Sequence, residues 1–263
     1  MNYYHHLHVN AMLPFANNIS GQPLTCCLLG ACFLCIATCT SSNQEQAVKT
    51  EQPDGKRMAI DYQSLLDNIQ KNRKTFSRNY ENGNDSVQSN ILAKSREYVE
   101  KMMKDSLIPA WIGTSYAFDG TTDKPREGKI ACGYFVSTVL RDAGFRFNRF
   151  SLAKQPSGNI IRSVTEELKR FPNGSLSYFM NEVKRMDKGI YIPGLNDHVG
   201  FIVKDQSELK FCHAAYYAPY EVTCEQLAKA SAVANSSYRV LGKVLNKRMV
   251  EQWVAMRKIE TFR

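Results

Sequence analysis

Apolar side chains recur every three or four positions between residues 61 and 103, which indicates two amphipathic helices. The first covers residues 61–80, and the second runs from the capping residue Asp85 to about Met103. The polar sequence "ENGND" separates them. Residues 109–129, rich in Gly, Thr and Pro, are expected to form a long ordered loop.

The stretch "KIACGYFVSTVLRDAGF" places Cys132 directly before a new apolar run. This run predicts a helix from Cys132 to about Ala143, ended by Gly144. Two further helices are predicted over residues 159–170 and 176–186, with "PNG" between them.

Short β-branched and aromatic runs then predict strands at residues 189–194, 198–203, 208–216 and 237–245. A short helix is expected at residues 223–230 and a terminal helix at residues 246–260. Helices followed by strands indicate an α+β domain with an antiparallel sheet. We find no internal repeat in the sequence.

The N-terminal part contains an uncharged apolar run, "LTCCLLGACFLCIAT", which is shorter than the roughly 20 residues that a membrane-spanning helix needs. It is typical of the apolar core of an export signal, although no Lys or Arg precedes it. The sequence "IATC" resembles a bacterial lipoprotein cleavage box, which makes Cys39 the expected site of lipid attachment; "LGAC", ending at Cys32, is a rival box. Plain secretion, a membrane anchor and a buried N-terminal helix remain alternatives. We therefore expect a signal segment at 1–39, a flexible polar linker at 40–57 and a single catalytic domain at 58–263.

The 263 residues, 43% hydrophobic and 11% aromatic, suffice for a substantial core. The net charge of +9 favours anionic partners or solubility alone, but no basic–aromatic or zinc-finger signature indicates nucleic acid. Three cysteines lie beyond the N-terminal part, and their spacing predicts no disulfide framework. Cys212 and Cys224 are therefore interpreted as packing residues.

Only two histidines, His198 and His213, lie beyond residue 8, and both fall on predicted strands. If these strands pair as a hairpin, both rings can share one face, which we expect to be the face covered by the Cys132 helix. A thiol attacks an amide as thiolate, which a helix N-terminus and a nearby imidazole favour. Cys132 then serves as nucleophile, His198 as base and His213 as the group that orients the base. A metal site is disfavoured because alternation turns Cys212 away from His213.

The segments "TSYAFDG", "ACGYFVSTVL", "DHVGFIV" and "FCHAAY" together resemble the NlpC/P60 cysteine peptidases, a compact papain-like family, over residues 85–216. The resemblance implies a papain-like fold, with N-terminal helices on an antiparallel sheet and the nucleophile at a helix N-terminus. It matches Cys132 to the nucleophile, His198 to the base and His213 to the orienting group. It matches Tyr116 to a tyrosine that lines the site near the oxyanion. Ala131 and Gly133 depart from the Asp and Ser that usually flank the cysteine.

The resemblance further implies amide hydrolysis through a thioester, most often in cell-wall peptidoglycan stem peptides. We accordingly expect an exported, membrane-anchored lipoprotein of the bacterial cell envelope that acts as a monomer, without cofactor or metal. Its partners would be peptidoglycan or another amide substrate and the membrane, not nucleic acid. Two alternatives stay open: an amidase or acyltransferase with the same triad and a non-wall substrate, and a catalytically inactive envelope-binding lipoprotein.

Overall fold

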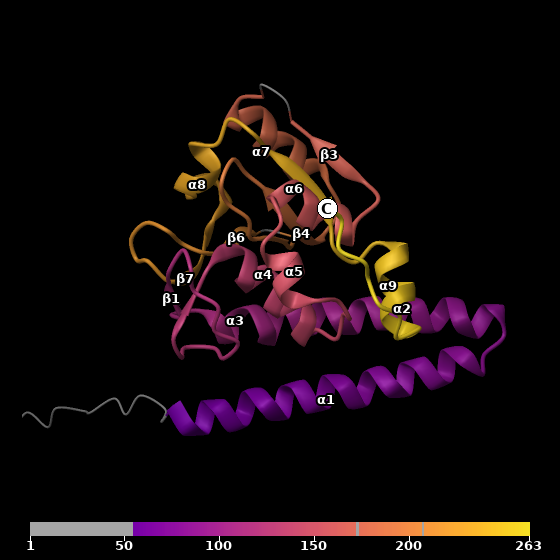
Figure 1. Ribbon diagram of the computed structural model, residues 1–263. Helices are drawn as coiled ribbons and strands as arrows, with labels where there is room; N and C mark the ends of the chain where they lie inside the picture. Colours follow the sequence, from indigo (N-terminus) through magenta and orange to yellow (C-terminus); the bar gives the residue numbers. More distant parts are fainter. Residues whose placement is uncertain (1–54, 172–173, 207) are drawn as a thin grey trace, which may run out of the picture. The chain divides into compact units, whose positions relative to one another are not determined.

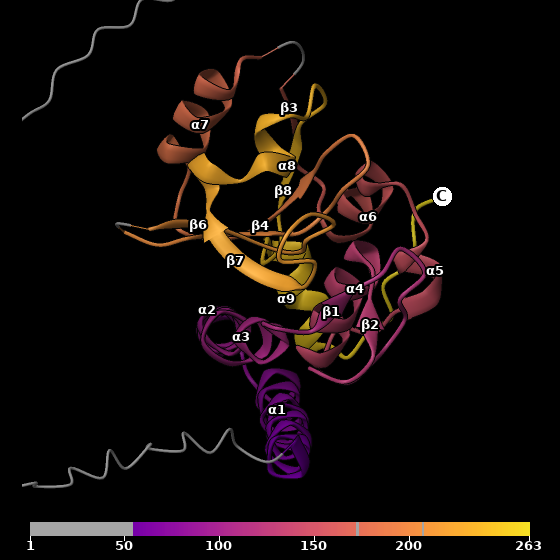
Figure 2. The same cartoon turned by 90° about the vertical axis from the view of Figure 1, so that its left-hand side faces the viewer.

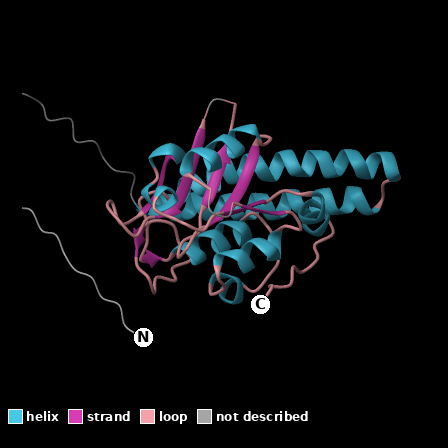
Figure 3. Ribbon diagram, turned by 90° about the horizontal axis from the view of Figure 1, so that it is seen from above, coloured by secondary structure: helices cyan, strands magenta, loops and turns pink. Residues whose placement is uncertain are grey.

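The computed structural model describes residues 55–171, 174–206 and 208–263, and it confirms the predicted α+β class (Figure 1). Two long antiparallel helices, α1 (Gly55–Glu81) and α2 (Asp85–Met102), form a hairpin that Figure 3 shows side by side. The side chain of Asn84, one residue before the expected cap, accepts a hydrogen bond from the backbone N–H of Val87 and so begins α2. Helix α1 already begins at Gly55, inside the stretch expected to be a linker.

Helix α2 continues into a π-helical turn (Met103–Leu107) and the short α3 (Ile108–Trp111). Two short parallel strands, β1 (Ser115–Tyr116) and β2 (Lys129–Ile130), bracket the predicted loop and lead into α4 (Cys132–Asp142). The cysteine segment therefore forms the helix that its pattern predicts, with Cys132 as its first residue.

All strand pairs of the six-stranded sheet are antiparallel, in the order β3-β8-β4-β5-β6-β7. The strands are β3 (Leu168–Arg170), β4 (Gly189–Gly194), β5 (Phe201–Lys204), β6 (Leu209–Ala214), β7 (Val222–Gln226) and β8 (Val240–Lys243). The predicted hairpin of the two histidine strands is confirmed, since β5 pairs with β6 in the register Phe201↔Cys212.

Helices cover both faces of this sheet, as Figure 2 shows. One face packs against α4 and α6 (Ser157–Val164), with Phe135 of α4 in edge contact with Phe201. The other face packs against α7 (Leu176–Arg185) through Phe179, Ile202 and Phe211. The short helices α5 (Arg149–Ala153), η2 (Leu227–Lys229) and α8 (Ser231–Ala234) connect these layers.

The last helix, α9 (Lys247–Val254), joins the helical hairpin to the rest of the domain. Its fully buried Trp253 lies within 5.9 Å of the Phe76 ring and 6.3 Å of the Tyr98 ring, measured between centroids. The indole N–H of Trp253 donates to the carbonyl of Ala143 at 2.7 Å. The C-terminal segment therefore fixes α1 and α2 beside the C-terminal end of α4.

Two predicted helices are wrong in part. The helix expected over 159–170 ends at Val164, and residues 168–170 form β3, because they pair with β8. Residues 223–230 were expected to be helical, but Thr223 to Gln226 belong to β7, which pairs with β6, and a 3-10 turn follows. Cross-strand pairing overrides local propensity in both segments. None of the described helices is long and apolar enough to cross a membrane.

Candidate functional site

Cys132 is the first residue of α4, and the backbone around it is held without a capping side chain. Ala131 occupies the N-cap position in an extended conformation and provides no side-chain acceptor. Its backbone N–H donates to the carbonyl of Gly120, and its carbonyl accepts from Phe135. The first amides of α4 are thus left without a capping side chain beside the sulfur, where they carry the partial positive charge of the helix.

The environment of the Cys132 thiol favours its neutral form. Burial raises the pKa of Cys132, while hydrogen bonding from the backbone N–H groups of Val199, Gly133 and Cys132 itself opposes that rise. Val199 directly follows His198, so the sulfur lies against the His-Val-Gly segment. These N–H groups are also the donors that an anion on or beside the sulfur would use.

Cys132 and His198 line the same pocket, which has a volume of about 510 Å³. Its remaining walls come mainly from α6 and the turn that precedes it, and from Asn196 and Tyr238. Among the hydrogen bonds of the described residues, none joins the Cys132 sulfur to the His198 ring. The structure therefore brings the two residues to one pocket without a hydrogen bond between them.

The two histidines do meet. Nε2 of His198 and Nδ1 of His213 lie 2.7 Å apart, with the rings nearly perpendicular. His198 is 4% exposed and His213 is fully buried, stacked on Phe211 at a centroid distance of 4.3 Å. The expected proximity of the two histidine rings is thus present, and it leaves Nδ1 as the other nitrogen of His198.

Glu225 extends this pair, and the sequence analysis did not identify it. Oε1 of Glu225 lies 3.0 Å from Nε2 of His213, and the hydroxyl of Tyr217 donates to the same oxygen at 2.7 Å. A carboxylate only accepts, so Nε2 of His213 carries a proton and its Nδ1 accepts one from Nε2 of His198. Nδ1 of His198 is then unprotonated, which is the state that a general base requires.

The signal that could have located Glu225 is the alternation in "EVTCEQ", in which Thr223 and Glu225 share one side of a strand. Because a helix was predicted over residues 223–230, the alternation typical of a strand was not considered there. Glu225 is in register with Phe211 on β6, two positions from His213.

The expected face of the sheet was wrong for His213. Alternation along β6 places His213 with Phe211, on the face packed against α7, while Cys212 points to the face packed against α4. His198 precedes β5, which begins at Phe201, so strand alternation does not assign its side chain to either face of the sheet. The two rings therefore meet at the end of the strands and not beneath α4.

Both rings are neutral at neutral pH. Burial, and secondarily His213, lowers the pKa of His198 to about 3. Burial also lowers the pKa of His213, against the opposing effect of the Glu225 carboxylate. The resting site therefore holds a neutral thiol and a neutral imidazole.

Tyr116, matched by resemblance to the oxyanion side of the site, lies in β1 with its backbone N–H donating to the carbonyl of Tyr220. Tyr116 and Cys132 are both partly buried and pack against the same hydrophobic core. Burial and then the charge of Cys132 raise the pKa of Tyr116. The phenol therefore stays protonated near Cys132 and can act as a donor.

Close backbone contacts explain why glycine occupies two positions near the pocket, Gly133 next to Cys132 and Gly200. A Cβ at Gly133 would collide with the carbonyl oxygen of Ala153, because α5 passes directly against the start of α4. A Cβ at Gly200 would lie 2.7 Å from the carbonyl oxygen of Cys212 and 2.9 Å from Cβ of His213. Both glycines therefore permit the close backbone approaches that shape the pocket.

Cys212 and Cys224 form a disulfide between β6 and β7, so their interpretation as packing residues was wrong. They are directly opposite each other in the strand register, a relation that spacing alone does not reveal. The bond links the strand that carries His213 to the strand that carries Glu225. Cys39, the expected lipid site, lies outside the described residues.

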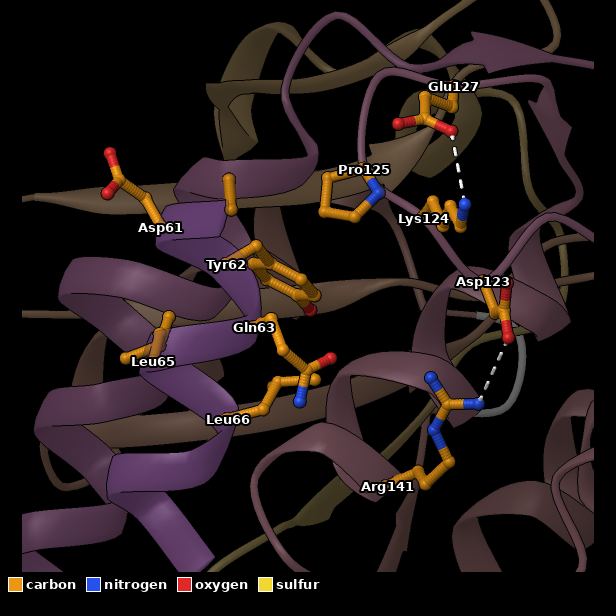
Figure 4. Close-up of a pocket in the computed structure, with 11 residues that line it drawn as sticks. Asp61, Tyr62, Gln63, Leu65, Leu66, Asp123, Lys124, Pro125, Glu127 and Arg141 are labelled. Carbon is orange, nitrogen blue, oxygen red and sulfur yellow. Dashed lines mark ion pairs between the residues drawn. The ribbon is translucent and has the colours of Figure 1, made fainter. Parts of the chain in front are cut away.

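A separate pocket of about 390 Å³ lies between the start of α1 and the loop before β2 (Figure 4). Leu65 and Leu66 form part of its wall, and four of its charged groups form two pairs, Lys124 with Glu127 at 3.6 Å and Arg141 with Asp123 at 3.9 Å. Neither Cys132 nor the histidines line it. Within the described part of the chain, no group of three or more His, Cys, Asp or Glu side chains is arranged to hold a metal ion.

The chain was compared with protein-family models, with curated proteins and with solved structures, and none of them matches it.

Proposed function

We propose that the protein is an exported cysteine hydrolase of the papain-like NlpC/P60 type, which cleaves an amide bond with Cys132 as nucleophile, His198 as base and His213 as the orienting group. One observation carries the proposal: a thiol at a helix N-terminus shares a pocket with the first member of the series His198–His213–Glu225. That series fixes the tautomer that leaves Nδ1 of His198 free to accept a proton.

In the proposed reaction, Nδ1 of His198 takes the thiol proton as Sγ of Cys132 attacks the carbonyl carbon. The carbonyl oxygen becomes an oxyanion, stabilised by the first N–H groups of α4 and by the Tyr116 hydroxyl. The C–N bond then breaks, and His198 returns the proton to the leaving amine. Water hydrolyses the resulting thioester by the same route in reverse, which releases the acid and restores the thiol.

A thiol and an imidazole that are both neutral at rest require proton transfer to accompany the attack. Substrate binding that excludes water and brings Sγ of Cys132 within hydrogen-bond distance of Nδ1 of His198 would promote that proton transfer. The hydrogen bond of His213 to Glu225 helps, because a carboxylate at the end of the series stabilises the positive charge that forms on the rings.

The proposed substrate is the stem peptide of cell-wall peptidoglycan, met by a lipoprotein tethered through Cys39 in a bacterial envelope. The disulfide between Cys212 and Cys224 supports an exported protein, because such bonds persist in oxidising compartments. The net charge of +9 supports an anionic surrounding such as the wall or lipid headgroups.

The test is incubation with purified muropeptides, read by mass spectrometry, with Cys132→Ser as the isosteric control. New cleavage products with the native protein and none with the variant support the peptidase. Labelling of Cys132 by a thiol-directed acyl probe without muropeptide cleavage points to an amidase or acyltransferase acting on a non-wall substrate.

A second candidate is an envelope-binding protein without catalysis. It is favoured by the raised pKa of Cys132 and the lowered pKa of His198, both caused mainly by burial, and by the lack of a hydrogen bond between these two described residues. Retention of muropeptides by both the native protein and Cys132→Ser, with no cleavage and no probe labelling, would select this candidate.

A further inference from the structure

A pocket of about 580 Å³ lies at the far end of α4 from Cys132 and contains an unusual concentration of positive charge. Arg73 of α1, Arg141 of α4, Arg146 of the α4–α5 connection and Lys258 after α9 all line it, with the polar side chains Gln70 and Asn148. No carboxylate is among the described residues that line this pocket. Nine helical steps separate Cys132 from Arg141, or about 14 Å along the axis, so this is a different place from the thiol pocket.

Two of these cations are already neutralised. Arg141 donates to Asp142 at 2.8 Å and points toward Asp123, as Figure 4 shows. Lys258 pairs with Glu260 at 3.0 Å. These two residues contribute donors to the pocket but little net charge.

The other two cations, Arg73 and Arg146, have no carboxylate partner among the described residues: their hydrogen bonds go to backbone carbonyls, and the guanidinium of Arg73 also lies over the Trp253 ring, 5.7 Å from its centroid. Nε of Arg73 donates to the carbonyl of Trp253 at 2.8 Å, and Nη1 of Arg146 donates to the carbonyl of Met256 at 2.8 Å. Arg73 is only 3% exposed, and its buried Nη2 has no hydrogen-bond partner. Burial, and secondarily the charge of Arg146, lowers the pKa of Arg73 to about 10.

A buried guanidinium nitrogen without an acceptor costs free energy, and a second guanidinium nearby adds repulsion. A bound oxyanion would offset the repulsion between the two guanidinium ions, because its oxygens accept from the fork of N–H donors that arginine presents. Gln70 and Asn148 add neutral donors at the same pocket.

We propose that the pocket bounded by Arg73 and Arg146 binds the phosphate group of a ligand. The group sits between the two guanidinium ions, with Arg141 and Lys258 at the edges of the site. This site does not depend on the proposed hydrolase activity, since it shares no residue with the thiol pocket.

The test measures the thermal unfolding midpoint of the full chain as inorganic phosphate replaces sodium chloride at constant ionic strength. A ligand that binds only the folded state stabilises it by RT ln(1 + L/Kd), where L is the free ligand concentration, so the midpoint rises with ligand concentration, and a larger Kd moves this rise to higher concentration. Arg146→Gln removes one charge-assisted donor at an exposed position, and it should raise the phosphate concentration needed for the same shift of the midpoint by about tenfold or more. Arg170→Gln, an exposed arginine on β3 outside the pocket, is the matched control and should behave like the native chain.

A second titration with dimethyl phosphate separates two sources of the same chemistry, a terminal phosphate and a phosphodiester chain. A response to either compound that Arg146→Gln loses and Arg170→Gln keeps supports the site and identifies which form it accepts. Equal responses in all three proteins, or no response of the native chain to either compound, overturn the proposal.

Discussion

Glu225 is the residue that most changes the chemistry available to the histidine pair. Without it, the hydrogen bond between His198 and His213 is compatible with either tautomer of each ring. With the carboxylate 3.0 Å from Nε2 of His213, one arrangement of protons is favoured, and it presents a basic nitrogen of His198. In the proposed reaction Glu225 acts through His213 and is therefore a positioning residue.

Glu225→Gln should lower the rate of amide cleavage by about 10²-fold, the lower end of what general-base catalysis contributes. It should also lower the pKa of His213 further, because the carboxylate now opposes the effect of burial on that ring. The rate of substrate turnover and the NMR titration of His213 check the two effects. Glu221→Gln is the control, and Glu225→Asp should recover part of the rate; an unchanged His213 titration in Glu225→Gln would contradict the assigned role.

The buried rings also predict how stability depends on pH. His198 has a folded pKa of about 3 against an ordinary value of 6.5, so the unfolded chain binds more protons between these values. The free energy of unfolding should therefore fall as the pH is lowered below 6.5, and the contribution of His198 between pH 7 and pH 5 is about 2 kcal/mol. Denaturant unfolding of the native protein and of His198→Asn at both pH values measures it. The loss should be smaller by about that amount in the variant, and equal losses would refute a buried neutral ring.

At the scale of elements, the pocket is made by backbones that pass unusually close to one another. Helix α5 lies against the first turn of α4 at Gly133, and the end of β6 lies against Gly200. The disulfide between Cys212 and Cys224 holds the edge strand β7 to β6, and so keeps Glu225 beside His213. The resemblance leads one to expect a serine at position 133, but the close packing of α5 leaves room there only for glycine.

Gly133→Ser should destabilise the protein by about 1–3 kcal/mol, because its Cβ collides with the carbonyl oxygen of Ala153 and the two helices must separate. Gly158→Ala, in α6, is the control, because its Cβ would meet only the flexible hydroxyl of Tyr238 at 3.3 Å. Thermal unfolding of the two variants tests the contact. A Gly133→Ser protein as stable as the native one would show that α5 does not constrain this position.

At the scale of the whole molecule, the proposal joins an envelope location to the site. The described domain contributes a disulfide, a thiol pocket and a separate basic pocket, while the proposed tether depends on Cys39 near the N-terminus. A tether holds an enzyme at the membrane face, where an anionic surface attracts a protein of net charge +9.

Cys39→Ser should abolish partitioning of the protein into the membrane fraction of a bacterial host, because lipid attachment needs that thiol. Cys32→Ser, in the rival cleavage box, is the matched control and should leave partitioning unchanged. Membrane fractionation followed by mass measurement of the mature chain reads both variants. Partitioning lost only in Cys32→Ser would move the cleavage site to Cys32, and partitioning kept in both would refute the tether.

The sequence by itself determined the features that depend on neighbours along the chain. The α+β class, the long helices of the first half, the helix that begins at Cys132 and the hairpin of the two histidine strands all follow from periodicity and breaker residues. The contact between His198 and His213 was also predictable, since a hairpin brings its two strands together.

Only the tertiary structure decided the features that depend on register between distant segments. The partnership of Glu225 with His213, the disulfide, the strand at 168–170 and the face on which His213 lies all require knowing which residues are opposite each other across a ladder. A shift of one residue between β6 and β7 would separate Cys212 from Cys224 and turn Glu225 away from His213, and nothing local in the sequence excludes such a shift. The same holds for Arg73 and Arg146, far apart along the chain, whose pocket exists because α9 fixes α1 beside the end of α4.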